Sequence, residues 1–395
     1  MPLLLGIVLL AISSRAQAFR LSHCARFDQW FQQFAEELWN ATHLNCSSEH
    51  ERYCNLAESS VHPESIASKM LNCLLGTDWL NEATKANMAS AQVLLGFLPT
   101  ILTFVGCDPT ETSILALRRP LLAMLVAIGS PAPAPSRSFV HEDPRKLLER
   151  REGNEKNIEY SPVQNSALIT SQYVITIIAV ANTVELALEL GFLTVSSFAP
   201  SRWWLVILWT LLGLVVHILA SVTLRVRMIV RKTGARQDAG ASLQAPPQLN
   251  PRASLRDEFS FCSTHNKTEL YWRKESGWLI FLSWFTSSGT AIVVIYGTVV
   301  FSSFMFIATQ DATIIVLRYL VSALICRAVL TSELDGMRRA SHKQERTALN
   351  DTQGPSQRPA TDDLQDTISR AIPLRDLRAN NVHSRQSEPR YRQTN

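Results

Sequence analysis

The chain has 395 residues, of which 46% are hydrophobic and 18% are charged, and its formal net charge at pH 7 is +4. A net charge this small does not indicate binding to nucleic acid, and we expect no nucleic-acid partner. The mean hydropathy of +0.04 averages very apolar segments with polar ones, so their order along the chain is more informative than the mean.

Residues 1–18 are predicted to be a signal peptide. Their apolar core, Leu3–Ile12, is followed by Ala16-Gln17-Ala18, the small-x-small pattern that signal peptidase cleaves. A basic n-region is missing, but the core is too short to span a bilayer comfortably. We therefore expect cleavage after Ala18 and an extracytoplasmic segment behind it.

Residues 19–87 are predicted to form a small extracytoplasmic domain held together by disulfides. Two N-glycosylation sequons, which begin at Asn40 and Asn45, also indicate the secretory pathway. Because about 70 residues bury too little apolar surface to offset chain entropy, we expect two disulfides, with three pairings left open. The nearby histidines fit no standard zinc spacing, so we assign no metal ligand and no cofactor. The candidate cysteines are Cys24, Cys46, Cys54 and Cys73.

Within this domain, apolar side chains recur with the period of one helix face. We predict a single helix that packs this face on the disulfide core. The face consists of Phe27, Trp30, Phe31, Phe34 and Leu38.

Five later segments are long and apolar enough to cross a membrane as helices, which takes about 18 or more such residues. We therefore predict an all-α polytopic membrane protein with one span in residues 88–130, two in 166–224 and two in 278–330. The segments are Met88–Gly106, Ala167–Leu188, Trp203–Thr223, Trp278–Phe306 and Ala312–Leu330.

A sixth apolar segment follows the first span and is interrupted by Arg118-Arg119-Pro120. Only Leu121–Ser130 follows the break, and at 1.5 Å per residue it reaches about half of the hydrocarbon core. We favour a re-entrant or interfacial half-helix, which gives five crossings. Six crossings are the alternative, because adjacent arginines can snorkel from a longer helix that starts near Ser113.

Basic residues indicate the orientation of these helices. Arg225–Arg236 is rich in Arg and Lys and has no acidic residue, and such clusters accumulate on the cytoplasmic side. We therefore expect the N-terminus outside, the C-terminus in the cytoplasm, and cytoplasmic loops at 131–165 and 225–277. Residues 331–395 are poor in apolar side chains and are predicted to be a disordered cytoplasmic tail that binds protein partners. The oligomeric state is left open.

Ionisable residues inside a span are costly, so each is a candidate functional residue. Asn182 and Glu185 share one helix face, and Glu185 could pair with Arg318 inside the bundle. The interpretation that we favour places Glu189 among the lipid headgroups, with Glu185 within snorkelling reach of them. His217 is expected to make a hydrogen bond between helices.

One block of the chain, about Cys73–Ala132, has a distinctive series of short motifs. They are Cys73-Leu74-Leu75, Thr84–Ala91, Val93–Gly96, Pro99-Thr100, Leu117–Ala123 and Gly129–Ala132. This block resembles a family of uncharacterised multi-pass membrane proteins of filamentous ascomycete fungi. The resemblance implies a eukaryotic secretory route and implies that Arg118-Arg119-Pro120 is a structural unit. It supplies no activity or ligand.

An outer domain, a membrane bundle and an inner tail form a layout suited to signalling. We therefore predict a non-enzymatic sensor, adaptor or scaffold in the fungal secretory pathway or plasma membrane, with the lipid bilayer as its surroundings. No catalytic residue is assigned, because no catalytic motif stands out. The alternative is a transporter or channel that uses Asn182, Glu185 and the Ser/Thr-rich face near Ser283–Thr290. Close helix packing is the simpler interpretation of that face.

Glycosylation mapping tests the predicted orientation. Removing Asn40 or Asn45 should each increase the electrophoretic mobility of the protein by one glycan, because both sequons lie in the outer segment. Removing Asn266, which lies in a loop that we place in the cytoplasm, should leave the mobility unchanged. A glycan on Asn266 would place that loop outside and contradict the five-crossing arrangement.

Overall fold

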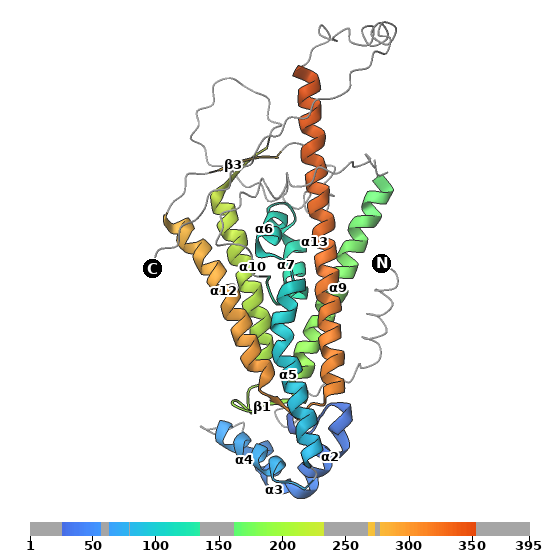
Figure 1. Cartoon of the computed structure of the whole chain (residues 1–395), viewed down its shortest axis with the longest axis vertical. Coiled ribbons are helices and arrows are strands. Elements are labelled where there is room, and N and C mark those ends of the chain that lie inside the picture. The colour runs from blue at the N-terminus through green and yellow to red at the C-terminus, as the bar shows by residue number, and fades with distance from the viewer. Residues whose placement is uncertain are drawn as a thin grey trace, which may run out of the picture. The chain divides into compact units, whose positions relative to one another are not determined.

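The computed structural model describes residues 26–56, 63–78, 80–134, 162–232, 268–272 and 277–352. It is helical for most of that length (Figure 1). The chain divides into one unit that ends at Gln344 and a second that starts at Glu345, and all contacts described below lie in the first. The predicted signal peptide and Cys24 lie outside the described residues, as do the middle parts of both predicted loops.

Within the described residues, five helices are long and apolar enough to cross a membrane, as predicted. They are α5 (Glu82–Val105), α9 (Pro162–Leu193), α10 (Leu205–Arg227), α12 (Gly277–Ser302) and α13 (Thr309–Thr352). The side chain of Asn81 caps α5, since its Oδ1 accepts a hydrogen bond from the backbone N of Thr84 at 2.8 Å. This cap makes α5 begin before the apolar segment predicted from Met88.

Two short helices occupy the sixth apolar segment. These are α6 (Pro109–Arg118) and α7 (Pro120–Gly129), separated by Arg119 at φ −127° and ψ 73°. Pro120 lacks an N–H and disfavours a helical conformation in the residue before it, so the chain breaks there. Ten residues make a helix about 15 Å long, which is too short to span a bilayer. Helix α7 matches the predicted half-helix, whereas α6 was not expected as a separate element.

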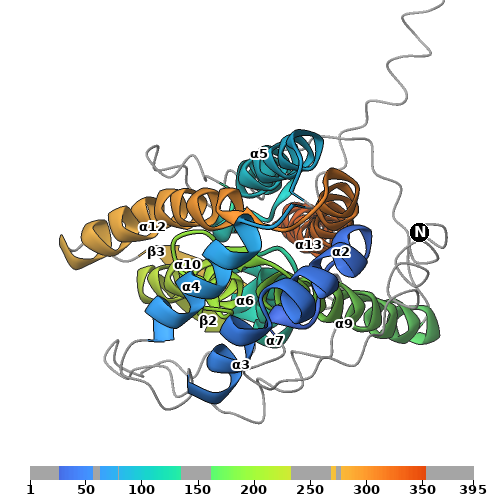
Figure 2. The same cartoon turned by 90° about the horizontal axis from the view of Figure 1, so that it is seen from below.

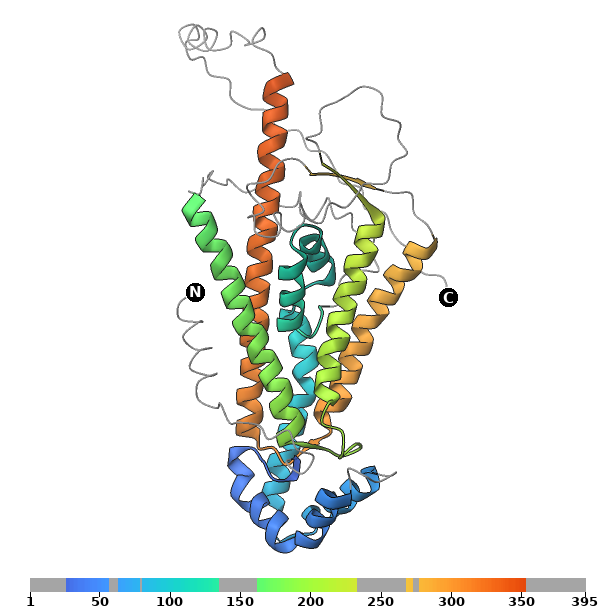
Figure 3. The same ribbon diagram turned by 180° about the vertical axis from the view of Figure 1, so that it is seen from behind.

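Two antiparallel ribbons tie helix ends together. β1 (Val195–Ser196), after α9, pairs with β4 (Phe304–Met305), before α13. β2 (Met228–Lys232), after α10, pairs with β3 (Thr268–Trp272), before α12. Successive long helices therefore run in alternating directions from α9 to α13 (Figure 3). Both strands lie within the predicted loop 225–277, and their β-branched and aromatic residues favour pairing.

Helices α6 and α7 lie between α9 and α10 (Figures 2 and 3). Helix α5 packs against α12, α12 against α10, and α9 against both α7 and α10. Trp209 is fully buried in the core, where its Nε1 donates a hydrogen bond to the carbonyl of Val293 at 3.1 Å. Its ring meets Phe301 edge-on with 4.9 Å between centroids. Gly297 leaves space for this indole, since a Cβ there would collide with it.

The N-terminal segment folds into a disulfide-bonded helical domain, here called the outer domain, consisting of the described residues between 26 and 80. Its helices are α2 (Ala35–Asn40), η3 (Ala41–Asn45), α3 (Ser47–Leu56) and α4 (Pro63–Leu75). Cys46 is bonded to Cys73, which decides between the pairings left open by the sequence. Cys54 is also in a disulfide. Asn40 and Asn45 are exposed, so both sequons are accessible for glycosylation.

The single helix predicted from Phe27 to Leu38 is wrong, although its apolar face is buried as expected. A 3-10 helix, η2 (Gln32–Phe34), precedes α2, and Phe31 has the extended angles φ −62° and ψ 145°. The aromatic rings reach different partners: Phe27 meets Tyr53 at 4.8 Å between centroids, and Trp30 meets Phe306 at 5.4 Å. A regular helix would direct both rings to one side, so the chain bends instead.

The outer domain is attached to the ends of the membrane helices. The Asn87 side chain on α5 accepts hydrogen bonds from the backbone N and the hydroxyl of Thr309, at 2.9 and 2.7 Å. Phe306, just before α13, has φ 63°, a left-handed conformation that a bulky side chain rarely adopts. Its buried ring contacts Trp30, so packing on the outer domain holds the strained residue in place.

The predicted start of the disordered tail, residue 331, is too early in the chain. Helix α13 continues without a break from Thr309 to Thr352, so residues 331–352 are helical. Leu334 and Met337 are buried against α6 and α7, and Glu333 is fully buried. These apolar contacts are spaced one helix turn apart within a polar sequence, which hides them from a hydropathy average. The rest of the predicted tail, 353–395, lies outside the described residues.

Glu64 on α4 attaches the outer domain to the loop between α9 and α10. Its carboxylate accepts hydrogen bonds from Ser201 Oγ at 2.6 Å and Arg202 Nε at 2.9 Å. Burial alone would raise the pKa of Glu64, but these hydrogen bonds outweigh it and hold the pKa below its usual range. The contact therefore contributes stability above the unfolded-state pKa of about 4.3 and loses it as pH falls through the lower folded-state pKa.

We expect Glu64→Gln to lower the thermal stability of the purified protein at pH 7. In acid the native Glu64 is itself protonated, so the two proteins should be equally stable. The cost should not exceed about 1 kcal/mol, because the Arg202 and Glu64 side chains are 49% and 38% exposed and water screens the pair. Glu82→Gln is the control, since Glu82 is 91% exposed and pairs only within α5. An effect of Glu64→Gln that stayed constant with pH would contradict the role of the ionised carboxylate.

Candidate functional site

Three charged side chains of α13 pair with residues of other elements of the bundle. The first is Arg318, whose guanidinium donates to Glu185 Oε2 at 2.9 Å and to Glu189 Oε2 at 3.0 Å. The pairing of Glu185 with Arg318 that the sequence raised is present. Glu189 is 3% exposed and faces Arg318, so its side chain points into the bundle rather than away from it. Attraction to the guanidinium, stronger in an apolar interior, accounts for its position.

Asn182 completes this cluster and fixes its geometry. Its Oδ1 accepts a hydrogen bond from Arg318 Nε at 3.0 Å. Its amide nitrogen donates to Ser322 Oγ at 2.7 Å and to the Arg318 carbonyl at 3.2 Å. Both ends of the amide are thus engaged with α13. Because one guanidinium faces two carboxylates, the cluster carries one net negative charge when both are ionised.

The second ion pair joins α13 to the break between α6 and α7. Arg119 Nη1 donates to Glu333 Oε1 at 2.8 Å and to Gln172 Oε1 at 3.0 Å. Both charged side chains are fully buried, and the guanidinium lies 5.1 Å from the centre of the Tyr173 ring. Snorkelling of Arg119 to the membrane surface, considered from sequence, does not occur. Glu333 was missed because it falls in the segment predicted as tail.

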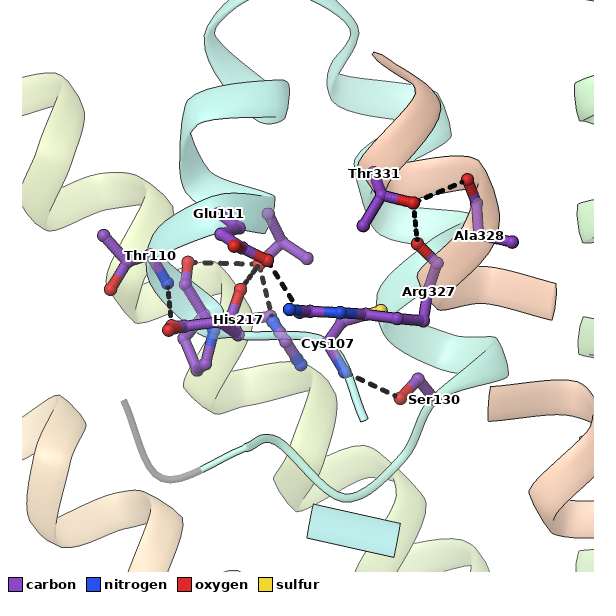
Figure 4. Close-up of polar contacts among 11 residues, drawn as sticks. Cys107, Thr110, Glu111, Ser130, His217, Arg327, Ala328 and Thr331 are labelled. Atoms are coloured by element: carbon purple, nitrogen blue, oxygen red, sulfur yellow. Dashed lines mark hydrogen bonds and ion pairs between the residues drawn. The ribbon is translucent and has the colours of Figure 1, made fainter. Parts of the chain in front are cut away.

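A third ion pair lies between these two along α13. Arg327 donates to Glu111 on α6, with 2.6 Å between Nη1 and Oε2 (Figure 4). On the other side of α6, the Thr112 hydroxyl is 2.8 Å from Nδ1 of His217 on α10, which confirms the expected interhelical hydrogen bond. Helix α6 is thereby linked to both α10 and α13.

A pocket lies beside His217, between α6, α7 and α10. Its volume is about 200 Å³, and its walls are mainly apolar. The Nε2 atom of His217 has no hydrogen-bond partner among the described residues. This pocket suits a hydrocarbon group better than an ion or a polar solute. The lining residues are Thr112, Ala116, Pro120, Ala123, Met124, Ala127, Leu214, His217, Ile218, Ser221, Val222 and Arg225.

The Ser/Thr-rich face near Ser283–Thr290 serves helix packing. The hydroxyls of Thr286 and Thr290 donate to carbonyls of their own helix, at 2.9 and 2.6 Å. A Cβ on Gly289 would come within 3.1 Å of Val216 on α10, so glycine permits close approach there. This face lies on α12, whereas Asn182 and Glu185 lie on α9 at the opposite side of the bundle (Figures 1 and 2). The structure therefore does not bring together the two parts of the predicted transport site.

Oppositely charged groups pair across helix interfaces, and each pair joins α13 to a different element. We call the pairs formed by Arg318, Arg327 and Glu333 the α13 ion pairs. No protein-family model, curated protein or solved structure matches the chain.

We expect Arg119→Met and Glu333→Met each to lower the free energy of unfolding by about 3 kcal/mol, because each leaves a buried charge unpaired. The double variant Arg119→Met/Glu333→Met should recover most of this loss, since no charge is then left in the apolar interior. Thermal and denaturant unfolding in detergent micelles provide the measurement.

Arg202→Met is the matched control, because its ion pair with Glu64 is exposed and should contribute less than about 1 kcal/mol. If the losses of the two single variants simply added in the double variant, the two side chains would not be coupled and the ion pair would have no energetic role.

Proposed function

We propose that the protein is a non-enzymatic membrane sensor or adaptor in which α13 links the outer domain to a cytoplasmic tail. The observation that carries this proposal is the continuity of α13. Its first residue, Thr309, is hydrogen-bonded to Asn87 below the outer domain, and the helix continues to Thr352. A change in the outer domain can thus reach the other end of the bundle through one rigid element.

The connection to the outer domain is suited to a switch. Phe306 holds a strained backbone conformation while its ring packs against Trp30. Strain of this kind costs about 1–3 kcal/mol and persists only while surrounding contacts enforce it. Movement of Trp30 would release Phe306 and change the start of α13. Each of the α13 ion pairs is either made or broken. Helix α13 could therefore shift between discrete positions that differ in which pairs are made.

The membrane arrangement that we propose has five crossings, with the outer domain outside and residues 353–395 in the cytoplasm. Alternating helix directions and the short α6 and α7 support five crossings, and the basic cluster after α10 supports the orientation. The Cys46–Cys73 disulfide supports an oxidising compartment for the outer domain. We also propose that residues 1–18 are a signal peptide and that the chain belongs to the fungal membrane-protein family resembled by Cys73–Ala132.

The transporter or channel is the weaker candidate. Glu185 and Asn182 are engaged with Arg318, and a transported ion would have to displace that guanidinium. The hydroxyls of Thr286 and Thr290 are bonded to their own helix and so offer little to a solute. These contacts support a role in holding α13 rather than in conduction, and we assign no catalytic residue.

The proposed function is tested by the partners of the tail. Deletion of 353–395 removes the region beyond α13 while leaving the buried Leu334 and Met337 in place. A labelling enzyme is fused to the C-terminus of each chain. We expect the deletion to abolish the labelling of most proteins that the native chain labels. A chain with a scrambled 353–395 segment of the same composition is the control for charge. If truncated, scrambled and native chains labelled the same proteins, the adaptor proposal would be wrong.

Coupling between the outer domain and the tail is tested by Asn87→Ala, which removes the two hydrogen bonds from Thr309 to the Asn87 side chain and leaves the one to the Asn87 carbonyl. We expect it to change the labelled set without loss of protein from the membrane. Ser90→Ala on the same helix is the matched control, because the Ser90 hydroxyl bonds only to Ala86 of its own helix and is exposed. Equal labelling by both variants would exclude transmission through this contact.

A further inference from the structure

The outer domain brings Asp28, His43 and His50 to one point on its surface. The three residues come from different elements: the turn before η2, η3 itself and α3. Their ligand atoms all lie within 4.8 Å of one another. We propose that these side chains form a binding site for a divalent transition metal, with Zn²⁺ as the ion that fits best.

The distances around Asp28 fit a shared metal ion. Asp28 Oδ1 lies 2.8 Å from His50 Nε2 and 3.5 Å from His43 Nε2. Zinc bonds of 2.0–2.2 Å in a tetrahedral arrangement place neighbouring ligand atoms about 3.4 Å apart. The two distances from Asp28 differ from this value by about 0.6 and 0.1 Å, and the distance between the two ring nitrogens is at most 4.8 Å. Two imidazoles and a carboxylate, rather than an all-oxygen set, select a transition metal over Mg²⁺ or Ca²⁺.

The contacts of His43 leave its Nε2 as the metal-binding atom. Its Nδ1 lies 3.1 Å from the carbonyl oxygen of Trp39, which can only accept, so Nδ1 carries a proton. Nε2 lies on the other side of the ring and faces Asp28 Oδ1 at 3.5 Å. A ligating histidine typically donates its other N–H to a carbonyl in this way. Asp28 Oδ1 is itself buried and accepts no hydrogen bond from the described residues, although two ring nitrogens are close.

The surroundings hold the site ready and leave it open to solvent. Trp39 stacks on the His43 ring with 4.6 Å between centroids. The backbone N of His50 donates to the carbonyl of Cys46, whose disulfide to Cys73 anchors the segment between the two histidines. Cys54 lies 3.6 Å from His50 Nε2, but it is in a disulfide and supplies no thiolate. Three protein ligands therefore leave a coordination position for water.

The side chains of Asp28, His43 and His50 are 35%, 31% and 14% exposed, so an ion can reach them. The site was not assigned from sequence because its members are 15 and 7 residues apart, which no zinc motif reproduces. It is independent of the proposed function, since it requires neither α13 nor the tail.

Zinc titration of the full-length protein tests the proposal. The protein is purified in detergent, freed of any affinity tag, stripped with a chelator and titrated with Zn²⁺ in competition with a chromogenic chelator. We expect one Zn²⁺ per chain, with an affinity at least tenfold above those for Mg²⁺ and Ca²⁺. His43→Ala and His50→Ala should abolish this site, and Asp28→Asn should weaken it at least tenfold.

Glu49→Gln is the matched control, because Glu49 is a half-buried carboxylate on the same helix as His50 that pairs with Arg52. It should leave Zn²⁺ binding unchanged. A second measurement needs no variant: Zn²⁺ should protect His43 and His50 of the native chain from modification by diethyl pyrocarbonate, as located by mass spectrometry. Absence of stoichiometric binding, absence of protection, or binding that survives loss of both histidines would overturn the proposal.

Discussion

An ionised side chain that enters an apolar helix bundle must find an opposite charge there, and α13 meets this constraint three times. Arg318, Arg327 and Glu333 reach α9, α6 and the α6–α7 break respectively. An unpaired charge at the buried Arg318 or Glu333 would cost several kcal/mol, and less at Arg327, which is 35% exposed, so the pairs restrict the placement of α13. The helix break at Arg119 meets the same constraint, because it places the Arg119 guanidinium beside the buried Glu333.

The same constraint shapes the function that we propose. Charges that pair with one another hold helices in position, whereas a conducting path needs charges that exchange partners with a solute. The paired groups lie along one helix that starts beside a strained Phe306 and an outer domain. Mechanical coupling along α13 therefore fits the contacts better than conduction, and the apolar pocket beside His217 provides no polar route.

Much of the fold could be predicted from local sequence. Apolar length predicts the five long helices, and Arg118-Arg119-Pro120 predicts the short helix α7, because proline prevents continuation whatever the surroundings. The helical period puts Asn182 and Glu185 on one face, and the sequence raised the pairing of Glu185 with Arg318 as a possibility. Glu333, Leu334 and Met337 were missed, because a polar helix with one buried stripe resembles a solvated tail when hydropathy is averaged. The aromatic face from Phe27 was predicted as one helix, although its rings reach two partners.

The sequence by itself determined the class of the protein, the number of long apolar helices and the presence of a cysteine-rich outer segment. These depend on composition and on spacing along the chain, which no folding partner changes. Only the tertiary structure decided which cysteine joins Cys46, which carboxylates face Arg318, and that Asp28 meets His43 and His50. Such contacts join residues far apart in sequence, and their energies depend on burial and distance that arise only when the helices pack.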